Sequence, residues 1–506
     1  MTTSERPAGT LAPGILPVVA LDRENGKPIY RQLYEGYRDA IVERRLKSGQ
    51  RLPSTRGLAE ELAISRIPVL NAFEQLLAEG YLESRPGAGT FVARSLPEAI
   101  SRPARPARPS RAGAPGSPAR RAPRLLARRS EAVGGGAPSR WLEGREAFHF
   151  PSPPLDRFPV KVWASLVARH ARRGESGDLH YQPAIGLTAL RETVAAYLRT
   201  SRAVRCDADQ ILIVNGSQSA LDLTVRVLLD EGSPVWVEEP GYFGTHQALR
   251  LGGARMVPVP VDDAGLDVDA GIARCPRPRA VFVTPSHELP LGVTMSASRR
   301  MRLLEWADHH GVWIVEDDYD GEYRYGNLPI ASLQGLDRGS RVIYIGTFTK
   351  SLYPSLRLGY VVLPRDLVGP FAATRRAMDY FTPLFFQRVV ADFVREGHFE
   401  RHLRRTRIVC RERREALVAA LDRHFGDRLR VVGDRAGMFL TVLLPRGLRD
   451  EEVASLAAER GVRTLPLSPC YLGRARRRQG LVLGYGGVPT AAIGDAVRRL
   501  RTAFPA

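Results

Sequence analysis

Lysine is rare in this chain, and its rarity draws attention to one side chain. The 506 residues include 74 lysines and arginines, of which only Lys27, Lys47, Lys161 and Lys350 are lysine. Since arginine is used wherever a positive charge is enough, a retained lysine points to chemistry that needs a primary amine. Only a primary amine forms an imine with an aldehyde, and a guanidinium does not.

The residues around Lys350 suit an aldehyde that also carries a phosphate. Lys350 lies in IYIGTFTKSLYPSLRLGY, directly after a run that predicts a strand over residues 342–345. The hydroxyls of Thr347 and Thr349 precede it, and Arg357 follows seven residues later. Hydroxyls and a guanidinium bind phosphate, and the amine binds the aldehyde. The combination predicts pyridoxal 5'-phosphate (PLP) as the cofactor.

Three further segments fit this cofactor. ILIVNGSQSALDLTVRVLL predicts a strand, a turn at Gly216–Gln218 and an apolar helix, whose N-terminal N–H groups would hold a phosphate. VWIVEDDYDGEYRY places acids after a buried strand, where a carboxylate would keep a pyridine nitrogen protonated. VWVEEPGYFG places Tyr242 after a Pro–Gly turn, where its ring would stack on a flat ligand. Taken singly, each also has an ordinary explanation: a common strand–turn–helix unit, solvated acids, or packing.

A different pattern precedes these segments. Ser54 and Ser65 are candidate N-caps of two helices, and YLESRPGAGTFVA predicts two short strands around a turn. An earlier helix has its apolar residues on one face: Ile29, Leu33, Tyr37, Ala40 and Ile41. The helix after Ser65 is expected to bury Leu70, Phe73, Leu76 and Leu77. This order predicts a winged helix–turn–helix that binds DNA; a small helical interaction domain is the alternative.

The formal net charge of +20 also points to nucleic acid, but most of the excess is not in that DNA-binding pattern. Residues 95–140 hold ten arginines against Glu98 and Glu131, with eight prolines and five glycines. Such a segment buries too little surface to fold alone and predicts a flexible linker. The linker either attracts DNA phosphates or serves as a solvated spacer. We call residues 18–94 the head and residues 141–506 the body.

Several classes of protein are excluded by composition. No run of 18 apolar residues exists, so we expect no membrane partner. The four cysteines are scattered and form neither a disulfide framework nor a metal-binding spacing. The apolar stretch from Leu11 to Ala20 is interrupted by Pro13, Gly14 and Pro17, which argues against a signal peptide. We expect a cytoplasmic protein without a metal, associated with the nucleoid when bound to DNA.

The head resembles the GntR family of regulators. The resemblance implies that the residues matching Arg56, Ser65 and Arg66 contact DNA, and that the wing around Gly87 and Gly89 approaches the minor groove. The chain departs from the family at residues 67–68, where Ile–Pro replaces small polar residues. This departure leaves the operator sequence open.

The body resembles a fold-type I, class I aminotransferase, and residues 18–506 together resemble the MocR subfamily of GntR regulators. The fold implied is α/β: a winged helix–turn–helix, then a mostly parallel sheet with a smaller C-terminal α+β subdomain. The partners implied are double-stranded operator DNA and an effector that is an amino compound or PLP itself. The resemblance also implies a domain-swapped homodimer.

The resemblance assigns roles to the site residues. Lys350 would form the internal aldimine, Asp317 would pair with the ring nitrogen, and Tyr319 would hydrogen-bond the ring hydroxyl. Tyr242 would stack on the ring. The phosphate would be held by four residues: Ser217, Gln218, Thr347 and Arg357.

Two further positions follow from the same resemblance. Tyr181, in HYQPAIGLTALRE, matches a tyrosine that reaches the phosphate of the neighbouring subunit, which would build the site across a dimer interface. His287, in VTPSHELPLGVTMS, lies where enzymes carry an asparagine that contacts the cofactor.

Two departures argue against an ordinary α-amino-acid transaminase. Val482, in LVLGYGG, replaces the arginine that grips the substrate carboxylate, and Leu291 replaces a usual threonine. Three effectors remain: an amine or sulfonate, an amino acid held by another arginine such as Arg477 or Arg478, or PLP itself. We expect a PLP-dependent transcriptional regulator without full turnover. The alternative is a competent aminotransferase with an accessory DNA-binding head.

Overall fold

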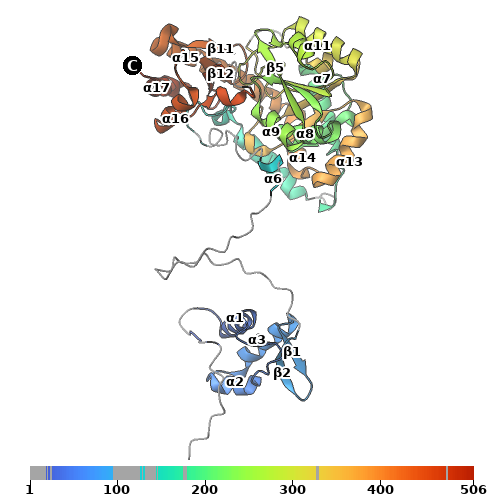
Figure 1. Ribbon diagram of the computed structural model, residues 1–506, viewed down its shortest axis with the longest axis vertical. Coiled ribbons are helices and arrows are strands. Elements are labelled where there is room, and N and C mark those ends of the chain that lie inside the picture. Colours follow the sequence, from blue (N-terminus) through green and yellow to red (C-terminus); the bar gives the residue numbers. More distant parts are fainter. Residues whose placement is uncertain are drawn as a thin grey trace, which may run out of the picture. The chain divides into compact units, whose positions relative to one another are not determined.

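A computed structural model of the chain describes residues 19, 21–22, 26–94, 126–127, 129–131, 144, 146–174, 179–325, 330–473 and 477–505 (Figure 1). The chain divides into two compact units, residues 1–122 and 123–506, which contain the head and the body. Most of the predicted linker, 95–140, lies outside the described residues. The predicted domain boundaries at 94/95 and 140/141 therefore stay predictions.

The head consists of three helices and a hairpin. The helices are α1 (Ile29–Val42), α2 (Thr55–Glu61) and α3 (Arg66–Ala78). The strands β1 (Leu82–Arg85) and β2 (Gly89–Val92) pair antiparallel across a tight turn. Apolar side chains of all three helices and of the hairpin form one core, in which the rings of Tyr37 and Phe73 meet edge to face at 5.4 Å. This is the predicted order of a winged helix–turn–helix.

The helix starts and the buried helix faces in the head follow the sequence signals with two exceptions. Ser54 caps α2, since its Oγ accepts a hydrogen bond from the N–H of Gly57 at 3.1 Å. Ser65 stands at the N-cap of α3, but its exposed side chain makes no capping hydrogen bond. The prediction that Leu70 is buried is wrong: Leu70 is 37% exposed, and Val69 is buried. Val69 lies one helical turn before Phe73 and therefore shares its face.

The body is built on an eight-stranded sheet in the order β3-β10-β9-β8-β7-β4-β5-β6. Strands β9, β8, β7, β4 and β5 run parallel, whereas β10 is antiparallel to β3 and β9, and β6 is antiparallel to β5. Their bounds are β3 (Ile211–Val214), β4 (Pro234–Glu239), β5 (Arg255–Asp262), β6 (Gly265–Leu266), β7 (Ala280–Val283), β8 (Trp313–Asp317), β9 (Val342–Thr347) and β10 (Gly359–Val362).

Helices cover both faces of this sheet (Figure 1). Alternate strand residues point to opposite sides, and both sides are apolar, so both must be covered. Val235 and Val237 of β4 join a core formed with α8 (Ser217–Leu228), α9 (Phe243–Leu251) and α13 (Val368–Asp379). Trp236, between them, joins the core of the other face with α10 (Val268–Arg274), α11 (Ala297–His310) and α12 (Leu333–Leu336). Strands buried on both sides are typical of a parallel sheet in an α/β protein.

A second, antiparallel sheet belongs to the C-terminal subdomain, in the order β11-β12-β14-β13. Its core continues into that of the body's helices. The strands are β11 (Arg430–Val432), β12 (Phe439–Leu443), β13 (Leu465–Pro466) and β14 (Gly480–Gly484). The remaining helices of the body are α6 (Val160–Arg173), α7 (Thr188–Ser201), α14 (Leu384–Arg395), α15 (His398–Phe425), α16 (Asp450–Glu459) and α17 (Thr490–Arg501), of which α16 packs on this second sheet. The predicted α/β body with a smaller α+β subdomain is confirmed. In the part of the chain that the structure describes, no helix is long and apolar enough to cross a membrane.

Candidate functional site

The predicted site residues gather beyond the carboxyl ends of four strands of the large sheet: β3, β4, β8 and β9. Asp317 is the last residue of β8, and Lys350 follows β9 by three residues. Tyr242 follows β4, and Ser217 opens α8 directly after β3. Parallel strands end at one edge of a sheet, where α/β proteins bind their ligands. The fold thus brings together side chains that are more than 130 positions apart in the sequence.

These residues line a cavity of about 260 Å³. Most of the predicted cofactor residues are in its wall: Ser217, Gln218, Tyr242, Asp317, Tyr319, Thr347, Lys350 and Arg357. Two predicted residues, Tyr181 and His287, are not among those that line it.

Lys350 is buried in this cavity, and its amine is held by residues far away in the sequence. Its Nζ donates a hydrogen bond to the carbonyl oxygen of Pro151 and lies 4.5 Å from the centre of the Phe150 ring. Burial lowers the pKa of Lys350 to about 8, although the carboxylates of Asp320 and Asp317 oppose this effect. A sizeable fraction of the amine is therefore neutral and nucleophilic near pH 7.5.

Asp317 presents a buried oxygen that needs a partner. Its Oδ1 has no hydrogen-bond partner among the described residues, and buried acceptors in proteins are normally satisfied. Burial raises the pKa of Asp317 to about 7, and the nearby carboxyl groups of Asp318 and Asp320 add to this. A protonated ring nitrogen against Oδ1 would supply both the missing donor and a compensating positive charge. The donor set of this cavity thus fits PLP.

The opposite part of the cavity is built for an anion. Gly216, the N-cap of α8, has φ +83°, and a Cβ at this position would lie 3.1 Å from the Arg357 guanidinium. Glycine therefore allows Arg357 to approach the helix N-terminus, where Nη2 donates to the carbonyl oxygen of Asn215 at 3.1 Å. Ser217 and Gln218, at the N-terminus of α8, and Thr347 line the same cavity. A guanidinium, a hydroxyl and a helix N-terminus form a typical phosphate site.

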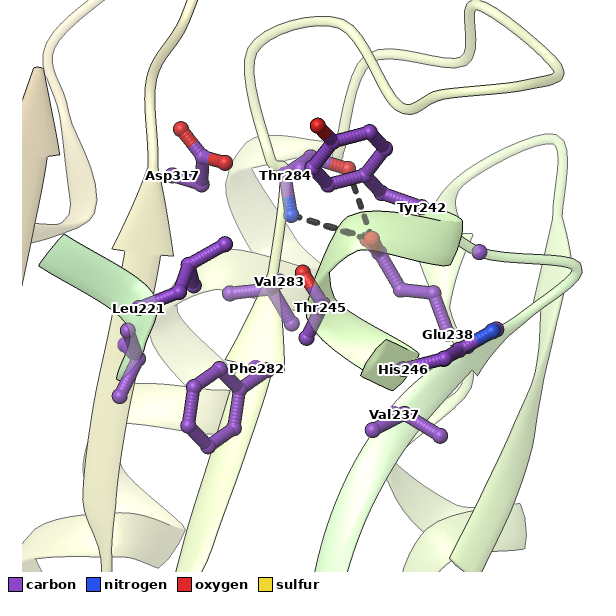
Figure 2. Close-up of a pocket in the computed structure, with 12 residues that line it drawn as sticks. Leu221, Val237, Glu238, Tyr242, Thr245, His246, Phe282, Val283, Thr284 and Asp317 are labelled. Carbon is purple, nitrogen blue, oxygen red and sulfur yellow. Dashed lines mark hydrogen bonds between the residues drawn. The ribbon is translucent and has the colours of Figure 1, made fainter. Parts of the chain in front are cut away.

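Tyr242 and Asp317 also border a smaller hollow that contains a buried glutamate (Figure 2). Glu238 accepts hydrogen bonds from the Thr284 N–H at 3.1 Å and from the Thr284 hydroxyl at 2.7 Å. Burial raises the pKa of Glu238 to about 7. Carboxyl groups therefore surround Asp317, and they favour a ligand that brings positive charge to this end of the cavity.

His287 lies behind the cavity wall. The Tyr319 hydroxyl donates to the carbonyl oxygen of His287 at 2.8 Å. The Nδ1 of His287 is 2.9 Å from Oδ2 of Asp320, and both side chains are buried. His287 is thus placed to fix Tyr319, whose side chain does line the cavity.

Tyr181 lies on the surface of its own chain and is 83% exposed. Its ring packs against Tyr380 and Phe381, at centroid distances of 5.5 and 6.2 Å. Phe385 and Phe386 are exposed as well. We call Tyr181, Tyr380, Phe381, Phe385 and Phe386 the aromatic surface.

Sequence reasoning missed one wall of the cavity. His149, Phe150, Pro151 and Ser152 line it, together with Leu289 and Pro354. Residues 149–152 form a loop with no motif of its own, about 200 positions before Lys350. The only signal is the aromatic and proline-rich run FHFPSPP at the start of the body.

The two departures from the aminotransferase pattern are buried apolar residues. Val482 is 1% exposed and lies in β14 between Thr441 of β12 and Leu465 of β13. Leu291 packs against Leu467 and Tyr471. Neither lines the cavity, so residue 482 supplies no cation to a carboxylate there.

The predicted DNA-contacting residues are all exposed in the head. Arg56 forms an ion pair with Glu60 at 3.2 Å, and Nε of Arg66 donates to the Thr55 hydroxyl at 3.2 Å. Gly87 and Gly89, at the tip of the hairpin, have φ of +74° and +108°. Glycine adopts such angles without strain, which allows this tight wing.

Comparisons with known proteins match both parts of the chain. Residues 154–483 match the family described as aminotransferase class I and II, and residues 29–92 match bacterial regulatory proteins of the gntR family. The probable rhizopine catabolism regulatory protein MocR of Rhizobium meliloti is 42% identical over 96% of both chains. The 2-aminoadipate transaminase of Thermus thermophilus is 36% identical over 70% of this chain and 88% of its own.

A solved structure extends the likeness to three dimensions. It is LysN, an α-aminoadipate aminotransferase from Thermus thermophilus, complexed with N-(5'-phosphopyridoxyl)-L-leucine. The match has a TM-score of 0.69 and 33% identity and covers 75% of this chain and 96% of the other.

Proposed function

This chain belongs to the MocR subfamily of GntR regulators, and from that membership we propose a PLP-dependent transcriptional regulator. The head binds operator DNA, and the body binds the cofactor and an effector that is an amino compound or PLP itself. One observation carries the proposal: the buried amine of Lys350 and the carboxylate oxygen of Asp317 that has no hydrogen-bond partner line the same cavity. The protein acts in the cytoplasm, on the nucleoid when it is bound to DNA.

Several residues of the cavity would hold the cofactor together. Lys350 would hold the aldehyde carbon, Asp317 would pair with the ring nitrogen, and Tyr242 would stack on the ring. Tyr319, fixed by His287, would contact the ring hydroxyl. The phosphate would be held by Ser217, Gln218, Thr347 and Arg357. When bound, PLP supplies an aldehyde that combines reversibly with primary amines.

The site is completed by a second copy of the chain. Tyr181 does not line the cavity of its own chain, and the aromatic surface is exposed except at the half-buried Phe381. Exposed aromatic side chains are typical of protein interfaces. In a symmetric dimer the aromatic surface is buried, and Tyr181 reaches the phosphate site of the partner. We propose further that this homodimer is domain-swapped, as the family resemblance implies.

The body resembles enzymes, yet we propose that it does not turn over as one. An aminotransferase must bind and release two successive amino-group carriers, whereas a sensor needs only to bind one. Val482 takes the place of the arginine with which aminotransferases grip a carboxylate, and it is a buried apolar residue of β14 that does not line the cavity. A competent aminotransferase is the second candidate function, and the Lys350–Asp317 pair favours it.

The test starts with the purified full chain and added PLP. The holoprotein should absorb visible light, and reduction with borohydride should leave the cofactor on the peptide that contains Lys350, as mass spectrometry would detect. Lys350→Ala should remove both signals, whereas the exposed Lys161→Ala should keep them. A reducible adduct that persists in Lys350→Ala contradicts the assigned site. Sustained amino-group transfer to 2-oxo acids across an amino-acid panel contradicts the regulator without turnover.

A further inference from the structure

Helix α3 exposes a large apolar side chain, that of Ile67. Its buried face is formed by Val69, Ala72, Phe73 and Leu76. On the opposite side, Ile67 is 67% exposed, and Asn71 and Glu74 are exposed too. Residues four positions apart are neighbours on a helix surface, with Cβ atoms about 5–6 Å apart. Ile67 and Asn71 thus form one patch on the first two turns of α3, and we call it the reading face.

The surroundings of the reading face favour a polyanion as the occupant. Arg66 is adjacent in sequence and exposed, and its Nε hydrogen bond to the Thr55 hydroxyl holds the guanidinium against the first residue of α2. Arg56 is exposed near the start of α2. Guanidinium groups beside a helix in a major groove bind phosphates and set the register of the protein on DNA.

The part of α3 that enters the groove is limited by charge. Glu74 follows the reading face by one turn, and Glu79 lies at the C-terminal end of the helix. DNA phosphates repel these carboxylates, whereas the N-terminal end of the helix attracts anions. Base contacts therefore fall on the first two turns, where Ile67 and Asn71 lie opposite the buried face, flanked by the exposed Arg66 and by Leu70, which is less exposed than Ile67.

We infer that Ile67 and Asn71 read A·T base pairs in the operator, an inference that rests on the proposed DNA-binding function. The major groove exposes the 5-methyl group of thymine, which an apolar side chain contacts, and the N6 and N7 atoms of adenine, which an asparagine amide pairs with. Base pairs rise about 3.4 Å per step. The spacing of the two side chains therefore places the two A·T pairs one or two steps apart in each half-site.

The experiment uses the full-length holoprotein and the tightest duplex selected from a randomised library. Each thymine of that duplex is replaced in turn by uracil, which removes only the 5-methyl group, and affinity is measured by fluorescence anisotropy. One thymine per half-site should be sensitive, with a loss of about 4-fold, as expected for one buried methyl group. Ile67→Ala should bind the thymine and uracil duplexes equally. Val42→Ala, which changes another exposed aliphatic residue of the head (47% exposed), should keep the difference.

Asn71→Ala provides the second measurement. It should weaken the selected duplex about tenfold and relax the preference for A·T at one position when the selection is repeated. Insensitivity of the wild type to uracil at every thymine, or an equal loss in Ile67→Ala, would overturn the inference while leaving DNA binding intact. A library from which no duplex is enriched would overturn the DNA-binding function itself and the inference with it.

Discussion

Replacing Asp317 by asparagine should have opposite effects on the cofactor-free and the cofactor-bound protein. The carboxylate is buried, and its Oδ1 has no partner among the described residues. In the cofactor-bound protein it would form a hydrogen bond to a charged group, and such bonds contribute about 1.5–3 kcal/mol. At about 1.4 kcal/mol per factor of ten, Asp317→Asn should weaken PLP binding roughly 10- to 150-fold.

Without the cofactor, the same carboxylate destabilises the fold. Burial, and then the neighbouring carboxyl groups, raise the pKa of Asp317 from 3.8 to about 7. The pKa of Asp317 is higher in the folded than in the unfolded protein. Its contribution to the free energy of unfolding is therefore full below pH 3.8 and is lost as pH rises through about 7. At about 1.36 kcal/mol per pH unit, the loss approaches about 4 kcal/mol above pH 7. The cofactor-free Asp317→Asn protein should therefore be the more stable one at pH 8, and the difference should vanish near pH 4.

Thermal unfolding at pH 4, 6 and 8, with and without PLP, tests this reasoning. Asp318→Asn is the matched control, because its carboxylate accepts a hydrogen bond from Nε of Arg202 at 2.7 Å. Burial alone would raise the pKa of Asp318, but Arg202 together with the hydroxyls of Tyr344 and Ser286 outweighs burial and lowers it. Asp318→Asn should thus destabilise the cofactor-free protein by about 3–5 kcal/mol, since it leaves a buried guanidinium unpaired. An Asp317→Asn protein that unfolds at or below the wild-type temperature at pH 8, with unchanged PLP affinity, would refute the assignment.

Four further outcomes are expected. When PLP is added to the cofactor-free protein, the visible absorption band should appear faster as pH rises from 7 to 9, because burial lowers the pKa of Lys350 to about 8 and the neutral amine reacts. Stopped-flow absorbance measures this rate, and a rate that does not change with pH counts against the assignment. Arg66→Ala should lose operator binding in a gel-shift assay while the body takes up PLP as before; unchanged binding would remove Arg66 from the interface. Tyr181→Ala should weaken PLP binding. In mixed dimers with Lys350→Ala, one of the two sites combines both wild-type residues, so one normal site should be restored; independent subunits would restore none. A coupled assay should find no sustained transfer from amino acids to 2-oxo acids, because Val482 offers no cation to a carboxylate.

The core of the candidate site could be predicted from the sequence because its residues sit at the ends of readable strands. A run of β-branched residues precedes Lys350 and marks the end of one strand. The acidic run that contains Asp317 follows an apolar stretch and marks the end of another. The parallel order of β8 and β9 then brings both to one edge. The winged helix–turn–helix was predictable for a similar reason, since each of its elements has its own local period or turn signal.

Other features depend on contacts that no local pattern records. The loop from His149 to Ser152 closes the cavity without a motif, and only tertiary packing brings it to Lys350. On α3, the apolar pattern fits a face centred on Leu70 as well as one centred on Val69, and packing against α1 decides between them. The surface position of Tyr181 cannot be derived from periodicity, because its partners belong to a different segment of the chain.

The hydrogen bond from Lys350 to Pro151 has a consequence for signalling. Pro151 lies about ten residues after the predicted linker ends, so the reactive amine is tied to the segment that leads back to the head. If Nζ takes up another partner, the carbonyl of Pro151 loses this donor and must find another or stay unpaired. Thermodynamic linkage makes the coupling reciprocal: if occupancy at Lys350 alters operator affinity by some factor, operator DNA alters the affinity for the occupant by the same factor. Operator DNA would then regulate binding at the cofactor site, just as occupancy of the cofactor site regulates binding to the operator.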